Sequence, residues 1–192
     1  MKILDTPTIE TERLILRKWE KRDLEGLIEL CSDTKVMEFF PSTLSEQEAA
    51  AFLERCLVRQ EEFGSCFPVV EDKTSGEFLG FTGLTIPAYQ DKLEFGPCVE
   101  IGWRLLPGCW GRGVALEAAT AWLDYGFKQC GLHEIIAFTT KENVKSRRVM
   151  EKLRMTYNSA DDFNHPSLSP DHPLAMHVLY RMRASDWSAM KA

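Results

Sequence analysis

Residues 105–119 read Leu-Leu-Pro-Gly-Cys-Trp-Gly-Arg-Gly-Val-Ala-Leu-Glu-Ala-Ala, and this stretch decides the fold. An apolar run over 99–106 is typical of a β-strand, and it ends at the Pro-Gly pair. A Gly-x-Gly-x-Ala turn then leads directly into an amphipathic helix. The first N–H groups of a helix lack partners, and the helix dipole favours an anion beside them. The pattern therefore indicates a phosphate site or, equally, a turn that only links a strand to a helix.

Strands and helices are expected on both sides of this unit. Apolar patterns of the β type predict strands over 11–19, 66–70, 78–86, 99–105, 134–140 and 177–183. Apolar residues at helical spacing predict helices over 24–31, 45–63, 113–129 and 143–153. Residues 158–173 are rich in Asp, Asn, Pro, Ser and His, and we expect a long loop of the kind that forms binding lids or is disordered. The order predicts a mostly antiparallel mixed sheet flanked by helices.

Local signals set several expected boundaries. Asp23 is a predicted helix cap, and Ser45 with Glu48 has the spacing of a capping box. Pro68 lacks an N–H, which predicts an edge strand or a bulge at that point. Gly131 is the expected C-terminal stop of the helix over 113–129.

Length and composition indicate one ordinary globular domain over residues 1–192. The chain is 44% hydrophobic and 27% charged, and its net charge of −6 argues against a nucleic-acid partner. That charge is compatible with a cationic substrate such as an amine, or it serves solubility alone. No apolar run approaches the ~20 residues of a membrane span, and residues 1–5 lack the apolar core of a signal peptide. We therefore expect no membrane partner and a cytoplasmic location.

Cysteine and histidine spacing predicts neither disulfides nor a metal site. The six cysteines form no Cys-x-x-Cys pair, and the four histidines lack helical i,i+4 spacing. We expect reduced thiols and no metal.

Two blocks of sequence resemble a known family. Residues 100–105 with 110–118 resemble the acetyl-CoA-binding motif of the GNAT (Gcn5-related) N-acetyltransferases, most closely their RimJ/RimL-type branch. Residues 143–153 are similar to that family's Asn-x-x-Ser helix, and the resemblance runs from about Glu10 to Arg183. It implies the α/β GNAT fold, with a mixed, mostly antiparallel sheet of six to seven strands. That sheet would be splayed at the cofactor site and flanked by about four helices.

Two residues depart from the family pattern. Trp110 stands where many members carry Gln or Arg, although an aromatic residue is common in this branch. Arg154 stands where a glycine usually ends the last helix, which leaves open whether that turn is rebuilt.

The resemblance implies an N-acyltransferase that moves an acetyl group from acetyl-CoA to a primary amine by direct attack in a ternary complex. The amine would be a protein N-terminal α-amine or a small molecule. The alternative is a CoA-binding sensor or interaction module without turnover. Homodimers are common in the family, so a homodimer is a possible assembly. The acceptor pocket is expected from the early helices and the loop over 158–173.

The resemblance also assigns cofactor-binding residues. The backbone of the turn would hold the pyrophosphate, and the preceding strand would lie beside the thioester. Arg112 would add charge or would be a solvated surface residue. Asn143 would contact the pantetheine and Ser146 would lie near the departing sulfur. The assigned set is Trp103, Arg104, Leu105, Trp110, Gly111, Arg112, Gly113, Val114, Ala115, Asn143 and Ser146.

Glu100 is the candidate general base. Strand alternation places Glu100 and Arg104 on one face, and a carboxylate in an apolar strand needs a partner or a function. The alternatives are a buried ion pair, with Arg104 or Arg17 among the partners, or an ordered water as proton acceptor.

The candidate acid is less specific. Many relatives carry a tyrosine seven residues after the asparagine, and this chain has Met150 there. Ser146, Tyr157 or a water could protonate the thiolate, or no acid is needed. Cys98 and Cys109 lie near the expected donor site, but no paired histidine is evident to activate either thiol, which favours direct attack over an acyl-cysteine.

Overall fold

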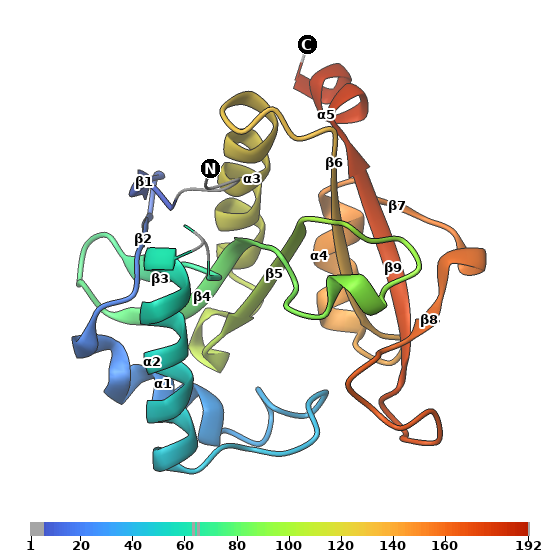
Figure 1. The fold of residues 1–192 in the computed structure, drawn as a ribbon. Coiled ribbons are helices and arrows are strands. Elements are labelled where there is room, and N and C mark those ends of the chain that lie inside the picture. The colour runs from blue at the N-terminus through green and yellow to red at the C-terminus, as the bar shows by residue number, and fades with distance from the viewer. Residues whose placement is uncertain (1–5, 63, 65, 192) are drawn as a thin grey trace.

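The structure is a computed structural model that describes residues 6–62, 64 and 66–191 (Figure 1). Its strands are β1 Ile9–Glu10, β2 Leu14–Arg17, β3 Val69–Asp72, β4 Phe78–Thr85, β5 Glu100–Leu105, β6 Glu134–Thr140, β7 Thr156–Tyr157, β8 Phe163–Asn164 and β9 Met176–Arg183. Its α-helices are α1 Leu24–Ser32, α2 Glu46–Glu62, α3 Val114–Lys128, α4 Val144–Lys152 and α5 Ala184–Lys191. No helix among these described residues is long and apolar enough to cross a membrane.

All the described strands join one sheet. Its order is β1-β2-β3-β4-β5-β6-β9-β7, and β8 pairs with β9 beside that path. Every pairing is antiparallel except the parallel contact of β5 with β6. The predicted α/β class and mostly antiparallel mixed sheet are confirmed. The described residues add three two-residue strands, β1, β7 and β8, and the helix α5 to the predicted elements.

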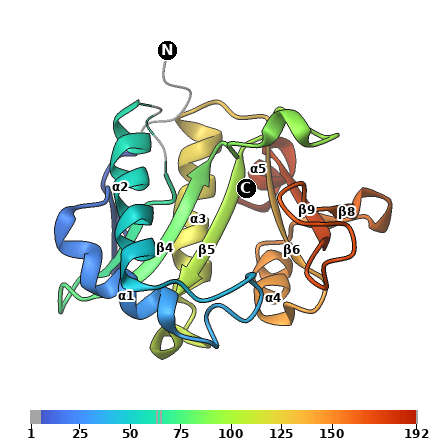
Figure 2. The same cartoon turned by 60° about the horizontal axis from the view of Figure 1, so that its bottom comes forward.

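Helices cover both faces of the sheet (Figure 2). Neighbouring residues on a strand point to opposite faces, so Val69 joins the core beneath α1 and α2 while Val70 joins the core beneath α3 and α4. Trp19 and Phe81 fill the first core, and the fully buried Trp122 of α3 anchors the second.

Several predicted boundaries need correction. The third strand begins after Pro68 and lies between β2 and β4, so the edge-strand reading was wrong. The register shifts between Val70 and Glu71, so the expected irregularity is present nearby. Asp23 does precede α1, but its side chain does not cap that helix; it pairs with Arg17 instead.

Other local predictions are confirmed. The Ser45 N–H donates to Glu48 at 2.8 Å and the Glu48 N–H donates to the Ser45 hydroxyl at 3.3 Å, which completes the capping box. Gly131 adopts a left-handed φ of 64° just beyond α3. The predicted end of the second helix at Phe63 lies outside the described residues. The loop over 158–173 contains a 3₁₀ turn, Ser159–Asp161, and strand β8, so it has more regular structure than expected.

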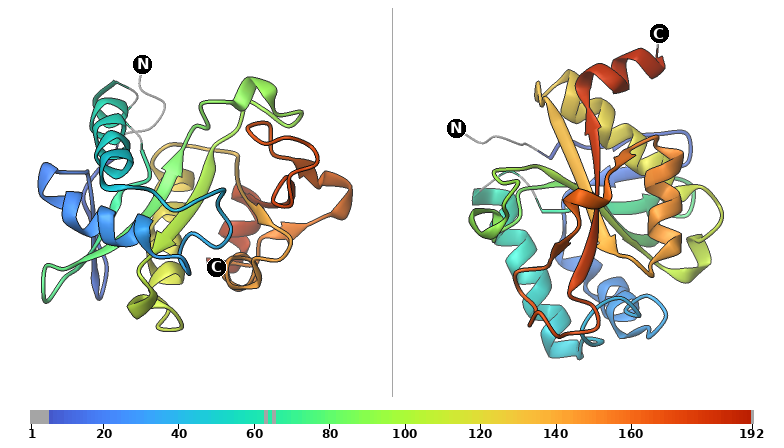
Figure 3. Two further views of the ribbon diagram at one scale, coloured as in Figure 1. Left: turned by 90° about the horizontal axis from the view of Figure 1, so that it is seen from below. Right: turned by 90° about the vertical axis from the view of Figure 1, so that its right-hand side faces the viewer.

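The sheet is splayed at its parallel junction. The β5–β6 ladder has a single register pair, Glu100 with Ile136, beside a hydrogen bond from the Ile136 N–H to the Val99 carbonyl at 3.0 Å. Beyond that pair the two strands diverge, as the views along and across the sheet show (Figures 1 and 3). The predicted splay is confirmed, and it leaves one backbone edge of β5 facing open space.

Candidate active site

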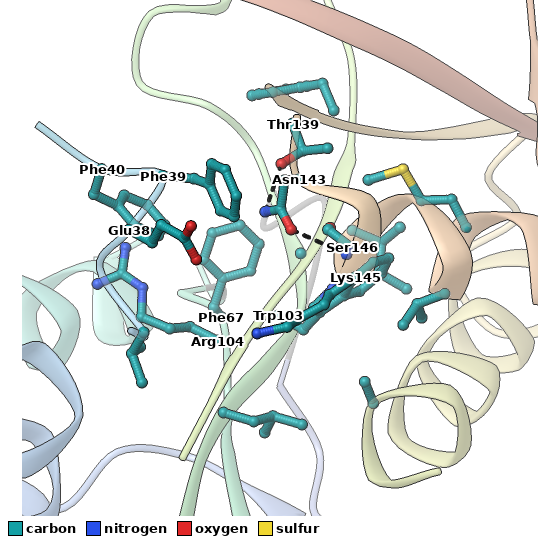
Figure 4. Close-up of a pocket in the computed structure, with 18 of the residues that line it drawn as sticks. Glu38, Phe39, Phe40, Phe67, Trp103, Arg104, Thr139, Asn143, Lys145 and Ser146 are labelled. Carbon is teal, nitrogen blue, oxygen red and sulfur yellow. Dashed lines mark hydrogen bonds between the residues drawn. The ribbon is translucent and has the colours of Figure 1, made fainter. Parts of the chain in front are cut away.

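A cavity of about 780 Å³ occupies the space where β5 and β6 diverge (Figure 4). Its walls come from β5, the glycine turn, the start of α4, the segment 35–41 after α1, and residues between 165 and 177. It brings together these predicted site residues: Glu100, Trp103, Arg104, Leu105, Trp110, Gly111, Gly113, Val114, Ala115, Asn143 and Ser146. The 158–173 loop contributes to the walls as expected, whereas no described residue of the early helices does, and the segment 35–41 after α1 takes their place.

Arg112 is the predicted site residue that does not line the cavity. Its guanidinium donates to the Gly108 carbonyl at 3.4 Å, and its own carbonyl accepts from Arg13 at 3.0 Å. The structure therefore favours the surface role that the sequence left open for this arginine.

The glycine turn is shaped for an anion. Gly111 and Gly113 have left-handed φ values of 73° and 81°. A Cβ at Gly111 would meet no atom within 4 Å, and one at Gly113 would meet only the Arg13 guanidinium at 3.5 Å. The glycines are thus required by backbone conformation, and the space above them is open. Among described residues, no acceptor takes a hydrogen bond from the N–H groups of Gly111, Gly113, Val114, Ala115 or Leu116. Such a group of free donors at a helix N-terminus fits a phosphate.

Lys145 brings positive charge to the same end of the cavity. Its ammonium lies 4.1 Å from the centroid of the Trp110 ring, and the Trp110 indole N–H donates to the Leu105 carbonyl at 2.8 Å. Arg148 and Lys152 of α4 also line the cavity. These basic residues were not predicted as part of the site, although the basic run directly after Asn143 could have indicated them.

Asn143 holds the start of α4 against β6. Its side-chain oxygen accepts from the Ser146 N–H at 3.1 Å, and its amide nitrogen donates to the Thr139 hydroxyl at 3.0 Å (Figure 4). The Ser146 hydroxyl has no hydrogen-bond partner among the described residues, and the side chain lines the cavity. This arrangement keeps a hydroxyl free at the junction of β6 and α4.

Glu100 lies at the inner end of the cavity, where β5 leaves β6. No residue in the described part of the chain forms a hydrogen bond or ion pair with its carboxylate. Arg17 pairs with Asp23 at 2.7 Å and with Glu71 at 2.8 Å instead, so the ion-pair reading for Glu100 was wrong. Burial raises the pKa of Glu100 to about 8. Its deprotonated carboxylate, which forms as pH rises through about 8, is a base suited to accept a proton from an ammonium of similar pKa.

Arg104 lies further along the same face of β5. Its guanidinium carbon is 3.8 Å from the centroid of the Phe40 ring, and one terminal nitrogen lies 3.6 Å from the Cys31 sulfur. Its Nε is buried without a hydrogen-bond partner among the described residues. The side chain thus presents a cation to the cavity that no described carboxylate neutralises.

A comparison with models of protein families identifies the family of this chain. The model of the acetyltransferase (GNAT) domain matches residues 13–156, which contain the turn, Glu100 and Asn143. The chain belongs to the GNAT acetyltransferase family. The expected family is therefore confirmed.

Individual relatives and a solved GNAT structure are also similar to this chain. The uncharacterized N-acetyltransferase YnaD of Bacillus subtilis is 35% identical over 151 residues, which is 77% of this chain and 81% of that protein. The FsC-acetyl coenzyme A-N(2)-transacetylase of Aspergillus fumigatus is 30% identical over 198 residues, covering 100% of this chain and 82% of its own. A GNAT-family acetyltransferase structure from Bacillus anthracis superposes with a TM-score of 0.75 at 28% identity, covering 93% of this chain and 99% of that chain.

Aromatic and histidine side chains extend this GNAT cavity beyond the predicted residues. The Tyr89 hydroxyl lies 2.9 Å from Nε2 of His165, whose ring centroid is 5.0 Å from that of His177. Burial lowers the pKa of His165 to about 4, so the ring is neutral at pH 7. The spacing of these residues along the sequence does not predict that they lie close together. The fold brings them together.

Two other groups considered from the sequence lose support. Tyr157 is not among the residues lining the cavity; its ring stacks on Tyr180 with centroids 5.2 Å apart, and its hydroxyl donates to Asp162 at 3.0 Å. Burial raises the pKa of the Cys109 thiol, and burial together with Glu100 raises that of Cys98 to about 11. A protonated thiol is a poor nucleophile, which disfavours an acyl-cysteine.

Proposed function

We propose that this GNAT protein transfers an acetyl group from acetyl-CoA to a primary amine by direct attack in a ternary complex. The observation that carries the proposal is one cavity in which a set of unpaired backbone N–H groups and an unpaired carboxylate face the same space. Acyl transfer to an amine needs both, because the donor carries phosphates and the ammonium must lose a proton.

The donor end would use backbone and positive charge. The free N–H groups of Gly111 and of residues 113–116 bind the pyrophosphate, and Lys145 adds charge beside them. The open edge of β5 pairs with the pantetheine arm past Trp103 and Leu105, as a neighbouring strand would. The A. fumigatus relative named for acetyl coenzyme A supports this choice of donor.

The acceptor end would use Glu100. The carboxylate takes a proton from the ammonium, and the neutral amine then attacks the acyl carbon as the carbon–sulfur bond breaks. The Ser146 hydroxyl or a water supplies a proton to the thiolate, because Met150 carries none to give. The buried, protonated Cys98 and Cys109 support direct attack.

Finer assignments are proposals of the same kind. We place the chain in the RimJ/RimL-type branch on the motif over 100–118. We place it in the cytoplasm because all six cysteines are free thiols, as is typical of a reducing compartment.

An acceptor screen tests the function. Purified protein is incubated with acetyl-CoA and with N-terminal peptides, polyamines or aminoglycosides, while thiol release and product mass are followed. Acetylation of at least one class is expected. Tight CoA binding without turnover on any of them would favour the sensor alternative.

A matched pair of variants tests the donor site. Gly113→Asp places a carboxylate where the pyrophosphate is expected, whereas Gly131→Asp places one at a similar left-handed φ beyond the other end of α3. Calorimetry should show CoA affinity lost in the first and kept in the second. Unchanged affinity in folded Gly113→Asp would contradict the donor site.

A further inference from the structure

We propose that the acceptor amine also carries a carboxylate, and that Arg104 binds this carboxylate at the aromatic end of the cavity. The inference rests on the proposed acetyl transfer and names the substrate class of the same site.

The first argument is the missing counter-charge. No carboxylate in the described part of the chain forms an ion pair with Arg104, and its Nε is buried and unpartnered. The nearest polar contact is the Cys31 sulfur at 3.6 Å, and burial raises the pKa of that thiol, so it remains neutral. A buried cation without a partner is costly, and proteins keep one mainly where a ligand completes it.

The second argument is shape. The guanidinium carbon lies over the Phe40 ring at 3.8 Å from its centroid and over the Phe81 ring at 5.2 Å, so these aromatic neighbours restrain it. A guanidinium fixed by stacking keeps the edge of its N–H fork free, and that fork matches the two oxygens of a carboxylate. Burial lowers the pKa of Arg104, but a guanidinium remains charged at neutral pH.

The third argument is alignment with the reacting end. Glu100 and Arg104 lie four residues apart on one face of β5, which places their Cα atoms roughly 13 Å apart. Gly102 lies between them, and a Cβ there would meet the Phe67 ring at 2.9 Å and a Glu100 oxygen at 3.5 Å. Gly102 and the Phe67 ring therefore make the path between Glu100 and Arg104 apolar. It suits an acceptor whose amine and carboxylate are joined by an aliphatic or aromatic spacer.

The carboxylate of Glu38 could compete with a ligand carboxylate for Arg104. It comes from the same segment as Phe40, lines the cavity, and lies on the Arg104 side in Figure 4, yet it forms no ion pair with Arg104. Its exposed position leaves the guanidinium to a ligand.

The experiment uses matched probes that differ only in charge. We choose 5-aminopentanoate and 4-(aminomethyl)benzoate, each against its carboxamide, with the full chain saturated with CoA. Calorimetry gives the dissociation constants, and thiol release with acetyl-CoA gives turnover. In the wild-type protein at least one carboxylate should bind tenfold or more tightly than its carboxamide. Arg104→Met should abolish this preference, Arg104→Lys should reduce it, and Glu38→Gln should keep it.

The outcomes separate the two proposals. Equal binding of carboxylate and carboxamide in both pairs, or an unchanged preference in folded Arg104→Met, overturns the carboxylate site. A preference that depends on Arg104 without any turnover supports this site and counts against acetyl transfer. Turnover of the amines without a charge preference supports acetyl transfer and overturns the site. Loss of the preference in Glu38→Gln as well would show that the preference does not depend specifically on Arg104, which would overturn the role of Arg104.

Discussion

At the scale of single residues, Glu100 and Arg104 are ionisable groups on one strand, and neither forms an ion pair with a described residue. Glu100 lies at the last β5–β6 pair, and Arg104 lies against Phe40. The buried Arg17, by contrast, contacts both Asp23 and Glu71. The fold therefore leaves ionisable side chains in the cavity available to a ligand.

Glu100→Gln should lower kcat/KM by ~10²–10⁴-fold, the usual effect of removing a general base. Because burial raises the Glu100 pKa to about 8, wild-type activity should rise with pH through that value. The variant should lose this step while its acetyl-CoA affinity stays the same. A pH–rate profile from 5 to 10 checks both, with the exposed Glu94→Gln as the control.

Stability measured on the same variant separates a base from a structural group. The folded-state pKa of Glu100 lies above its unfolded value of 4.5, so its contribution to stability is complete below pH 4.5 and is lost as pH rises through about 8. Glu100→Gln should therefore melt at a higher temperature than wild type at pH 8–9, and the gap should close toward pH 4. A variant less stable at every pH would restore the ion-pair reading.

Two arginines should respond to substitution in opposite directions. Arg17→Met leaves Asp23 and Glu71 buried without their cation and should cost about 3–5 kcal/mol of the free energy of unfolding. Arg104→Met removes a buried cation that has no carboxylate to leave behind, so we expect it to stabilise the fold. Urea denaturation of both variants checks this. Destabilisation of similar size in both would show that Arg104 has a hidden partner.

At the scale of elements, the end of α4 keeps a glycine-type turn without a glycine. Arg154 adopts a left-handed φ of 59°, and its N–H donates to the Glu151 carbonyl at 2.9 Å. The turn is therefore not rebuilt, and the arginine accepts the strain of this conformation.

Arg154→Gly should raise the free energy of unfolding by about 0.5–1 kcal/mol, because relief of left-handed strain outweighs the extra entropy of an unfolded glycine. Arg154→Ala keeps the Cβ and should show no gain. Chemical denaturation of the three proteins measures the difference. A gain in the alanine variant of equal size would assign the effect to the lost side chain instead of the backbone.

Elements set by local chemistry could be predicted from the sequence. The capping box at Ser45, the glycine turn and the helix cap at Asn143 depend on contacts within a few residues. The rest depends on distant contacts. The third strand begins later in the structure than the sequence predicts, because β2 and β4 pair with residues after Pro68. Helix α5 is held by Trp187, which is buried and donates to Asp124 of α3 at 2.8 Å, a contact 63 residues away.

The same division applies to the site. The proposed donor end comes from two continuous motifs, and the sequence could predict that these motifs line one cavity. The acceptor end joins the segment 35–41, Tyr89 and residues 165–177, which no sequence spacing relates. The sequence left the role of Arg112 open because a motif does not show which way a long side chain points.

At the scale of the whole molecule, the two parts of the sheet meet through one backbone pair and are otherwise joined by helices and loops. Bound CoA that pairs with the open edge of β5 should slow amide hydrogen exchange along β5 and at the start of α3. Amides of β1 and β2, at the far edge of the sheet, serve as the internal control. Exchange that slows equally everywhere would indicate global stabilisation, and exchange that slows nowhere would contradict pairing with this edge.

The splay also bears on how the chain avoids aggregation. An unpaired strand edge is a template on which other chains can add a strand, and proteins protect such edges at the rims of their sheets. Here the bare edge lies in the middle of the sheet, with α3 and α4 on one side and the 35–41 segment on the other. A second polypeptide would need room for side chains on both faces, whereas a thin arm such as pantetheine needs much less. The walls that would surround the proposed donor thus also protect this strand edge from self-association.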